Sequence, residues 1–301
     1  MVIKLKLSFI TLHFHFKYET IKNHLGYNEL GSWGANYSPQ EVSKLINCAY
    51  ESGINTFDHA DIYGGYTTEE LFGKGFKISG LDRDKFVYIS KCGIMYPCDK
   101  LPINVKHYDY SKKHILKSVE NSLKNLNTDY IDCLLLHRPS PIMDIKEISD
   151  TINELIDKKM IRKFGVSNFT ASQMKLIQME LKISFNQIEF SLTNFNPMFD
   201  GTLDFMQIND IKPMAYSPLG NYFSSKNKAL LDKVKNISLK YSCKEDEVLL
   251  SWILKHKSEI FPVIGTTKEE RIARSLKAEK INMDLIDWFE LLEASSGRRV
   301  P

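Results

Sequence analysis

The feature of this sequence that most constrains its fold is a recurring unit: a short apolar run, a polar turn and an amphipathic segment. The apolar runs are too uniformly hydrophobic to be strands with one solvated face. The amphipathic segments repeat their apolar residues every three or four positions, as helices do. Strands are expected at residues 24–27, 54–57, 86–91, 130–136, 164–167, 184–189, 213–216 and 260–264. Strands that alternate with helices in this way form parallel sheets.

The number of repeated units predicts the architecture. Helices are expected at residues 111–126, 144–158, 202–209, 228–241, 245–257 and 268–278, with another opening at Thr170. Eight parallel strands favour closure into a (β/α)8 TIM barrel. No G-x-G-x-x-G sequence follows a strand, as an open dinucleotide-binding sheet would require. The 301 residues contain no linker or low-complexity block, so a single domain is expected over residues 1–301.

The first 16 residues allow two interpretations. Residues 8–16 are apolar and follow two lysines, which faintly resembles a signal peptide. However, the run is short, is interrupted by two histidines and lacks a small-residue cleavage site. Apolar and basic residues alternate at positions 3–7, a pattern typical of a strand. We therefore expect an N-terminal strand or hairpin.

Composition narrows the possible partners. The chain has 40 basic and 37 acidic residues, and its basic residues are spread along the sequence. This argues against nucleic acid, which is bound by a basic face or stripe. No stretch is long and apolar enough to span a membrane. The five cysteines show no metal-binding spacing, which predicts reduced thiols, no bound metal and a cytoplasmic protein.

Polar side chains occupy the ends of three consecutive predicted strands. Asp58 directly follows residues 54–57, and Tyr63 comes five residues later, beside two glycines. Lys91 and His137 end the next two strands. Each has an ordinary structural explanation, such as a helix cap, a packed ring or a solvated lysine. In a barrel, however, the carboxyl ends of the strands form one face, which is where active sites lie.

The chemistry of these four residues fits together. A free phenol has a pKa of roughly 10, which makes it a weak acid near neutrality. A neighbouring ammonium favours the phenolate, and a carboxylate paired with that ammonium holds it in place. Tyr63 as proton donor, Lys91 as its tuner, Asp58 as anchor and His137 as the group orienting a carbonyl oxygen form a carbonyl-protonating site. Such a site needs a hydride donor, which implies a reduced nicotinamide.

From about residue 26 to its end, the chain resembles the aldo-keto reductases. The phrases that carry the resemblance are FDHADIYGGYTTEELFG, ISKCGI, LLLHRPSP, GVSNFT, NQIEFS, AYSPLG and PVIGTTKEERI. DHADIYGGY, SKCGI, HRPSPIMD and DGTLD are most similar to bacterial oxidoreductases of the YdhF type. The resemblance implies a (β/α)8 barrel, NADPH-dependent reduction of aldehydes or ketones, and a catalytic tetrad at Asp58, Tyr63, Lys91 and His137.

The resemblance also implies a set of NADPH-binding residues. Those matching the nicotinamide site are Ser167, Asn168 and Gln187 for the carboxamide and Tyr216 for the ring. Those matching the diphosphate loop are Ser217, Leu219 and Gly220. Those matching the 2′-phosphate site are Gly265, Thr266, Thr267, Lys268 and Arg271. This last stretch is basic and opens a helix, which suits an anion, although its charges could be ordinary surface residues.

Two parts of the binding region depart from the family or lie outside its motifs. Many members carry an acidic residue and an Asn near the adenine, where this chain has Arg274 and Ser275. The choice of NADPH over NADH therefore stays open. Loop aromatics are candidates for the wall of the substrate pocket, or they simply cover the barrel rim: Tyr27, Trp33, Tyr96, Tyr108 and Tyr222.

Two other functions compete with carbonyl reduction. A barrel that binds the nucleotide but acts as a regulatory or redox-sensing subunit could keep the same four residues. A metal-dependent hydrolase would need several His and carboxylate ligands. His59 and Asp61 lie near Asp58, but only His137 follows at a later strand end. The substrate, the direction of the reaction and the choice between monomer and dimer are not determined by the sequence.

Overall fold

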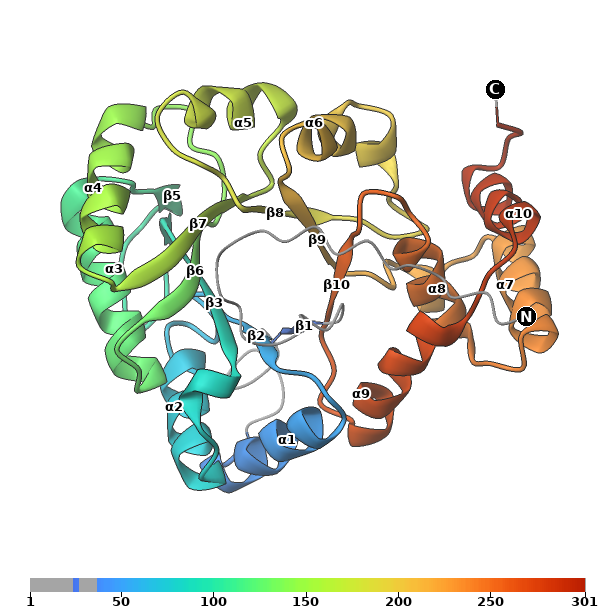
Figure 1. Ribbon diagram of the computed structural model, residues 1–301, viewed down its shortest axis with the longest axis horizontal. Helices are drawn as coiled ribbons and strands as arrows, with labels where there is room; N and C mark the ends of the chain where they lie inside the picture. Colours follow the sequence, from blue (N-terminus) through green and yellow to red (C-terminus); the bar gives the residue numbers. More distant parts are fainter. Residues whose placement is uncertain (1–23, 27–36, 301) are drawn as a thin grey trace, which may run out of the picture.

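Eight parallel strands close into a barrel in the part of the chain that the computed structural model describes, residues 24–26 and 37–300 (Figure 1). Around the barrel the order is β1, β10, β9, β8, β7, β6, β3, β2. The strands are β1 (His24–Gly26), β2 (Thr56–Asp58), β3 (Val87–Cys92), β6 (Ile131–Leu136), β7 (Ile161–Ser167), β8 (Phe185–Glu189), β9 (Lys212–Tyr216) and β10 (Phe261–Ile264). The predicted (β/α)8 barrel is confirmed. The N-terminal strand or hairpin expected within residues 1–16 lies outside the described residues.

The strands coincide with the predicted apolar runs, with one larger shift. Strand β7 was expected over residues 164–167 but begins at Ile161, because Ile161 pairs with Ile131 on β6. Strand β1 closes the barrel, since Leu25 pairs with Phe57 on one side and with Ile264 on the other. After β3, the short antiparallel pair β4 (Ile94–Met95) and β5 (His107–Tyr108) forms a separate two-stranded sheet.

Helices surround the barrel, as Figure 1 shows. They are α1 (Pro39–Glu51), α2 (Thr68–Ser79), α3 (Lys112–Leu126), α4 (Ile145–Asp157), α5 (Ala171–Gln178), α6 (Thr202–Ile208), α7 (Lys228–Lys240), α8 (Glu245–Leu254), α9 (Glu269–Ser275) and α10 (Leu285–Ser296). Helices α7 and α10 pack against each other at one side. None of these described helices is long and apolar enough to cross a bilayer.

Side chains at the helix starts set several of these boundaries. The predicted caps Ser111 and Thr170 accept hydrogen bonds from backbone N–H groups of the first turns of α3 and α5. Helices α1, α2 and α10 were not among the predicted helices. Helix α1 nevertheless carries a clear start signal: Ser38 and Glu41 form a reciprocal capping box ahead of its apolar face.

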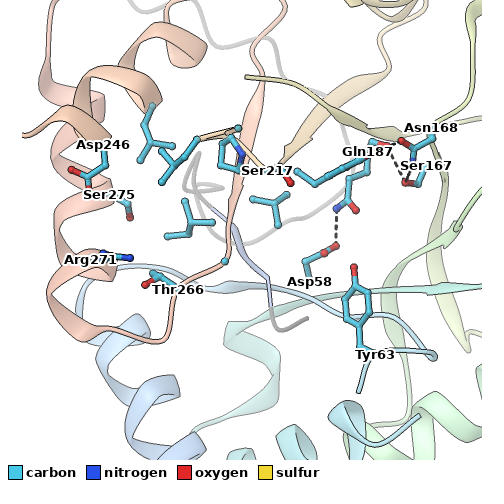
Figure 2. Close-up of a pocket in the computed structure, with 18 of the residues that line it drawn as sticks. Asp58, Tyr63, Ser167, Asn168, Gln187, Ser217, Asp246, Thr266, Arg271 and Ser275 are labelled. Atoms are coloured by element: carbon cyan, nitrogen blue, oxygen red, sulfur yellow. Dashed lines mark hydrogen bonds between the residues drawn. The ribbon is translucent and has the colours of Figure 1, made fainter. Parts of the chain in front are cut away.

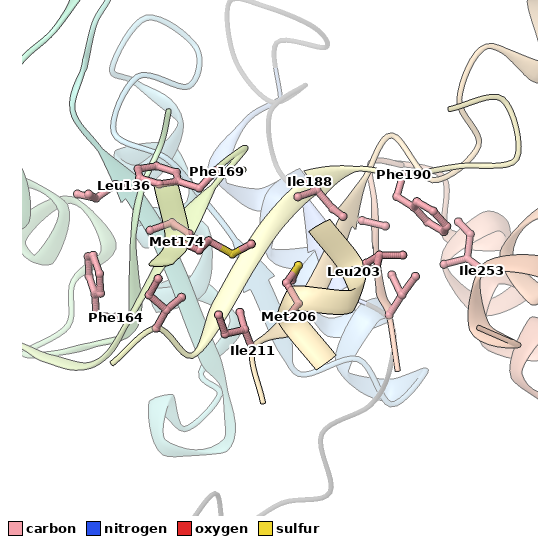
Figure 3. Packing of buried hydrophobic residues seen from close by; sticks show 14 of the residues in the cluster. Leu136, Phe164, Phe169, Met174, Ile188, Phe190, Leu203, Met206, Ile211 and Ile253 are labelled. Carbon is pink, nitrogen blue, oxygen red and sulfur yellow. The ribbon is translucent and has the colours of Figure 1, made fainter. Parts of the chain in front are cut away.

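The core has two layers, one inside the barrel and one between the barrel and the helices. Ile89, Cys133, Leu135, Met214 and Val263 fill the inside. The outer layer is larger, and Figure 3 shows part of it around β7, β8 and α6; its labelled members are Leu136, Phe164, Phe169, Met174, Ile188, Phe190, Leu203, Met206, Ile211 and Ile253. Successive residues of a strand point to opposite faces of the sheet. Because one face packs inside the barrel and the other packs against the helices, both faces of these strands are apolar.

Candidate active site

Strand alternation explains why polar side chains meet at one mouth of the barrel. On β3, Ile89 lies inside the barrel, so Lys91, two residues later, points inward too. The same alternation holds for β6, where Leu135 lies inside the barrel and His137 follows two residues later. It also holds for β9, where Met214 lies inside and Tyr216 ends the strand. These inward positions lie at the carboxyl ends of their strands, where the side chains project beyond the apolar core.

The ammonium of Lys91 is the centre of the site. Lys91 is completely buried, and its Nζ donates to Asp58 Oδ2 at 2.7 Å, to the His59 backbone oxygen at 2.7 Å and to Tyr63 Oη at 3.1 Å. An ammonium has three donors, so all are used. Burial alone would lower the pKa of Lys91, but Asp58 and then Tyr63 raise it overall. Lys91 therefore keeps its positive charge against the phenol oxygen.

Tyr63 and His137 lie together at this mouth, where both can face a substrate oxygen. Their ring centroids are 5.9 Å apart in an edge-on arrangement. Burial raises the pKa of Tyr63, and the Lys91 ammonium opposes that rise. The sequence predicted this influence of Lys91, but burial outweighs it and the phenol is protonated at neutral pH. Burial, with Lys91 next, holds the pKa of His137 well below its usual value, so the imidazole is neutral.

A cavity of about 460 Å³ opens over these residues and continues to the start of α9 (Figure 2). Asp58 and Tyr63 lie at one end in Figure 2, and Thr266, Arg271 and Ser275 lie at the other. Most of the predicted site residues line it: Asp58, Tyr63, His137, Ser167, Asn168, Gln187, Tyr216, Ser217, Leu219, Gly220, Gly265, Thr266 and Arg271. Lys91 is buried and bonded to Asp58 and Tyr63.

Besides Lys91, two predicted residues, both assigned to the cofactor, are not in the lining. Thr267 and Lys268 lie just outside the cavity, Thr267 partly buried and Lys268 exposed at the start of α9. The lining also includes residues that the sequence interpretation did not select, notably Arg138, Asp246 and Leu250. Arg138 directly follows His137 at a strand end, so its position in the sequence could have identified it as a candidate site residue. Asp246 and Leu250 lie on α8, and no local pattern marks them.

A chain of hydrogen bonds crosses the cavity wall from β9 to β2. Tyr216 Oη donates to Asn168 Oδ1 at 2.9 Å, and Asn168 Nδ2 donates to Ser167 Oγ at 2.8 Å. Ser167 Oγ donates to the Gln187 backbone oxygen at 2.9 Å, and Gln187 Nε2 donates to Asp58 Oδ1 at 2.9 Å. Gln187 and the tetrad are therefore linked directly, which the sequence did not indicate.

The turns after β7 and β9 have unusual backbone conformations. Asn168 and Ser217 have positive φ angles of 62° and 50°. Such values are uncommon for residues other than glycine and concentrate at functional sites. Gly220 has a φ of 53°, and a Cβ atom there would lie 2.0 Å from Thr193 Oγ1. Glycine at position 220 therefore lets the loop at residues 217–220 lie against Thr193 and Ser191, in the segment that follows β8.

The far end of the cavity differs from the pattern of many aldo-keto reductases. Arg274 is held by Asp246, with its Nε at 3.0 Å and its Nη2 at 2.5 Å from the same carboxylate oxygen. Ser275 Oγ donates to the Ile272 backbone oxygen. Arg271 is exposed and lines the cavity, and none of the ion pairs among the described residues includes it.

The loop aromatics expected at the pocket wall divide into three cases. Tyr96 and Tyr108 pack beside Tyr63 on a small apolar cluster formed by Ala60, Ile62 and Ile94. Tyr222 does not line the cavity and does not cover the rim, because the residue is 1% exposed and belongs to the core between the barrel and the helices. Tyr27 and Trp33 lie outside the described residues.

His59, considered above as a metal ligand, points away from the cavity. Its ring packs 4.4 Å from the Phe72 centroid and 5.9 Å from that of Tyr88, on the outer side of β2. Among residues 24–26 and 37–300, no group of three or more His, Cys, Asp or Glu side chains is arranged to hold a metal ion.

Known proteins similar to this chain agree on one family. The model of the Aldo/keto reductase family matches residues 24–294. The uncharacterized oxidoreductase YcsN of Bacillus subtilis is 40% identical over 90% of this chain and 93% of its own length. The 6-dehydroglucose reductase of Agrobacterium fabrum is 37% identical, covering 88% and 91%. The oxidoreductase YdhF of Escherichia coli is 36% identical, covering 92% and 94%.

Solved structures share the fold. The crystal structure of the thermostable aldo-keto reductase Tm1743 with the inhibitor epalrestat matches with a TM-score of 0.77 at 26% identity, covering 91% of this chain and 94% of that one. The aldo/keto reductase of Klebsiella pneumoniae in complex with NADP and acetate has the same TM-score at 23% identity, covering 93% and 92%, which establishes likeness of fold.

Proposed function

The chain belongs to the aldo/keto reductase family of oxidoreductases, and we propose that it reduces an aldehyde or ketone to an alcohol, with NADPH as cofactor and Tyr63 as proton donor. The observation that carries this proposal is the position of the Lys91 ammonium, bonded to both Asp58 and Tyr63 beneath a cavity. All five cysteines are free thiols, which supports a place in the reducing cytoplasm.

The protonation states of the site suit proton donation to a carbonyl oxygen. The Tyr63 oxygen accepts a hydrogen bond from Lys91, so its own proton is directed away from the ammonium. Neutral His137 has one N–H, which can donate to the same substrate oxygen and orient it. As negative charge develops on that oxygen, Tyr63 gives up its proton, and Lys91 stabilises the phenolate that remains.

The donors and acceptors along the cavity fit a dinucleotide. Asn168 Nδ2 has a second N–H, beyond the one donated to Ser167, that can donate to the oxygen of a carboxamide. The Ser167 hydroxyl gives its proton to the Gln187 backbone oxygen, so Ser167 would act by orienting Asn168. The Gln187 side chain bonds to Asp58 through its nitrogen, so its oxygen can accept from the carboxamide nitrogen. Tyr216 offers a ring for stacking at the same end of the cavity. NADPH would supply the hydride to the carbonyl carbon.

The remaining assignments concern the phosphates. The turn of Ser217, Leu219 and Gly220 lines the middle of the cavity and would hold the diphosphate. The cationic side chain of Arg271 lines the far end and would meet the 2′-phosphate, together with Gly265, Thr266, Thr267 and Lys268. Because Asp246 holds Arg274, we expect Arg274 to shape this end rather than to contact the adenine.

The experiment that tests this function has two stages. The purified protein is first titrated with NADPH and with NADH while its tryptophan fluorescence is followed. It is then given a panel of aldehydes and ketones, and cofactor oxidation is measured. Because one relative is named 6-dehydroglucose reductase, 6-dehydroglucose belongs in the panel. Tight NADPH binding with turnover supports the proposal. Binding without turnover of any carbonyl compound would favour a regulatory or redox-sensing subunit, and a folded protein that binds neither nucleotide would refute both.

A further inference from the structure

Arg138 places a cationic side chain in the cavity beside the tetrad. It lines the cavity together with Tyr63 and His137, and its guanidinium carbon is 5.8 Å from the centroid of the Tyr216 ring. None of the ion pairs within residues 24–26 and 37–300 includes Arg138. Glu189, an exposed residue at the end of β8, also acts on the Tyr216 hydroxyl but makes no ion pair with Arg138.

Hydrogen bonds to a core tyrosine hold the backbone of Arg138 in place. The hydroxyl of Tyr110 donates to the Arg138 backbone oxygen at 2.5 Å and accepts from the Arg138 N–H at 3.2 Å. Tyr110 is 7% exposed and belongs to the core. The preceding residue, His137, donates its N–H to the Cys92 backbone oxygen at 3.0 Å. The backbone position from which the Arg138 side chain extends is therefore fixed relative to the reacting groups by backbone hydrogen bonds, without any contact of the guanidinium.

The charge of Arg138 reaches the reacting groups, and no ion pair among the described residues balances it. Burial raises the pKa of Tyr63, and Lys91 and, more weakly, Arg138 oppose that rise. Burial lowers the pKa of His137, and Lys91 and then Arg138 lower it further. The charge of Lys91 is matched by Asp58 at 2.7 Å, and His137 is neutral. The tetrad is therefore close to neutral, and Arg138 adds a positive charge to the end of the cavity where the carbonyl reacts.

We propose that Arg138 binds an anionic group, a carboxylate or a phosphate, on the carbonyl substrate, so that the enzyme prefers anionic aldehydes or ketones. This inference rests on the proposed function. A guanidinium presents a planar fork of donors that matches both anions in a bidentate arrangement. A substrate held in this way would have its carbonyl near Tyr63 and His137, because Arg138 lines the same cavity as these two residues.

The test compares an anionic substrate with a neutral one in each of two pairs. 4-Carboxybenzaldehyde is paired with its neutral isostere 4-carbamoylbenzaldehyde, and glyceraldehyde 3-phosphate is paired with glyceraldehyde. Hydrogen bonds to charged groups predict a ratio of kcat/KM, anionic over neutral, of roughly 10 to 100 in at least one pair. The pair that shows it identifies the anion. Equal kcat/KM values in both pairs would overturn the inference while leaving carbonyl reduction intact.

Two variants distinguish a specific contact with Arg138 from a general effect of positive charge near the site. Arg138→Met should reduce the charge preference to within about threefold of unity, since the fork of donors is lost. Lys106→Met removes an exposed charge that also acts on His137 but does not line the cavity, and it should keep the preference. Equal loss in both variants would overturn the role of Arg138.

Binding provides a measurement that does not depend on turnover. Calorimetry with benzoate and benzamide, added to the protein saturated with NADP+, should show tighter binding of benzoate in the natural protein and not in Arg138→Met. NADPH affinity is measured in the same variant. If it falls as much as benzoate affinity does, Arg138 serves the cofactor and the inference is wrong. If no carbonyl compound is turned over with either nucleotide, the proposed function fails first, and this inference fails with it.

Discussion

Replacement of Lys91 by Met is the perturbation whose consequences the structure defines best. Met has nearly the same length as the lysine stem but has no charge. It leaves the Asp58 carboxylate, whose side chain is 3% exposed, with the Gln187 amide and without its cation. Removing one partner of a buried ion pair costs roughly 3–5 kcal/mol. We expect Lys91→Met to lower the free energy of unfolding by an amount in this range at pH 7.

The same change should abolish most of the activity. In the natural protein, the ammonium lies 3.1 Å from the phenol oxygen that becomes negative when Tyr63 gives up its proton. At an effective dielectric constant of about 20, this separation corresponds to about 5 kcal/mol of attraction. Rearranged dipoles and water recover part of it, so we expect kcat to fall by at least about 100-fold. NADPH affinity should change little, because Lys91 does not line the cavity.

The double variant Lys91→Met/Asp58→Asn separates folding from chemistry. Removing both charges should restore most of the lost stability without restoring turnover. Urea unfolding is measured at pH 7 for the natural protein and both variants. A single variant as stable as the natural protein at pH 7, or within threefold of its kcat, would refute the reasoning.

Three further predictions concern other parts of the site. Tyr63→Phe should lower kcat by about 10²- to 10⁴-fold, because the proton donor is lost, and should leave NADPH binding in fluorescence titrations nearly unchanged; unchanged turnover would exclude Tyr63 as the donor. Arg271→Ala should weaken NADPH by about tenfold and NADH much less, and equal losses would move the 2′-phosphate site elsewhere. Burial raises the pKa of Asp61 from 3.8 to about 8, with Ser118 opposing through its hydrogen bond. The folded protein therefore holds a proton that the unfolded chain releases, and this contribution to stability is lost as the pH rises through that range. Asp61→Asn should flatten this loss in urea unfolding at pH 5 and 8, and an unchanged pH dependence would contradict it.

Much of the site could be predicted because strand ends are readable locally. The apolar runs that end in Asp58, Lys91 and His137 show where each strand stops. The closed barrel brings these ends to one face, and period-two alternation directs the side chains inward. The phrases shared with the family supplied the proposed cofactor residues, of which all but Thr267 and Lys268 line the cavity.

Contacts between distant residues could not be predicted in this way. Gln187 bonds to Asp58 across 129 positions, and Asp246 on α8 holds Arg274 on α9. Tyr222 was expected as an aromatic residue on a loop, yet it is buried in the core. Nothing in the spacing of these residues encodes such partners, because the partners are set by how the closed barrel and its helices pack.

The sequence by itself determined the (β/α)8 class, the position of each strand end and the residue types that those ends carry. Hydrophobic periodicity and turn residues are local properties, because each depends only on residues close together in the sequence. Tertiary structure alone decided that Lys91 uses all three of its donors, that burial outweighs Lys91 in the pKa of Tyr63, and that Arg138 lines the cavity beside the tetrad. These properties depend on distances and desolvation between segments far apart in the chain, which exist only once the barrel has closed.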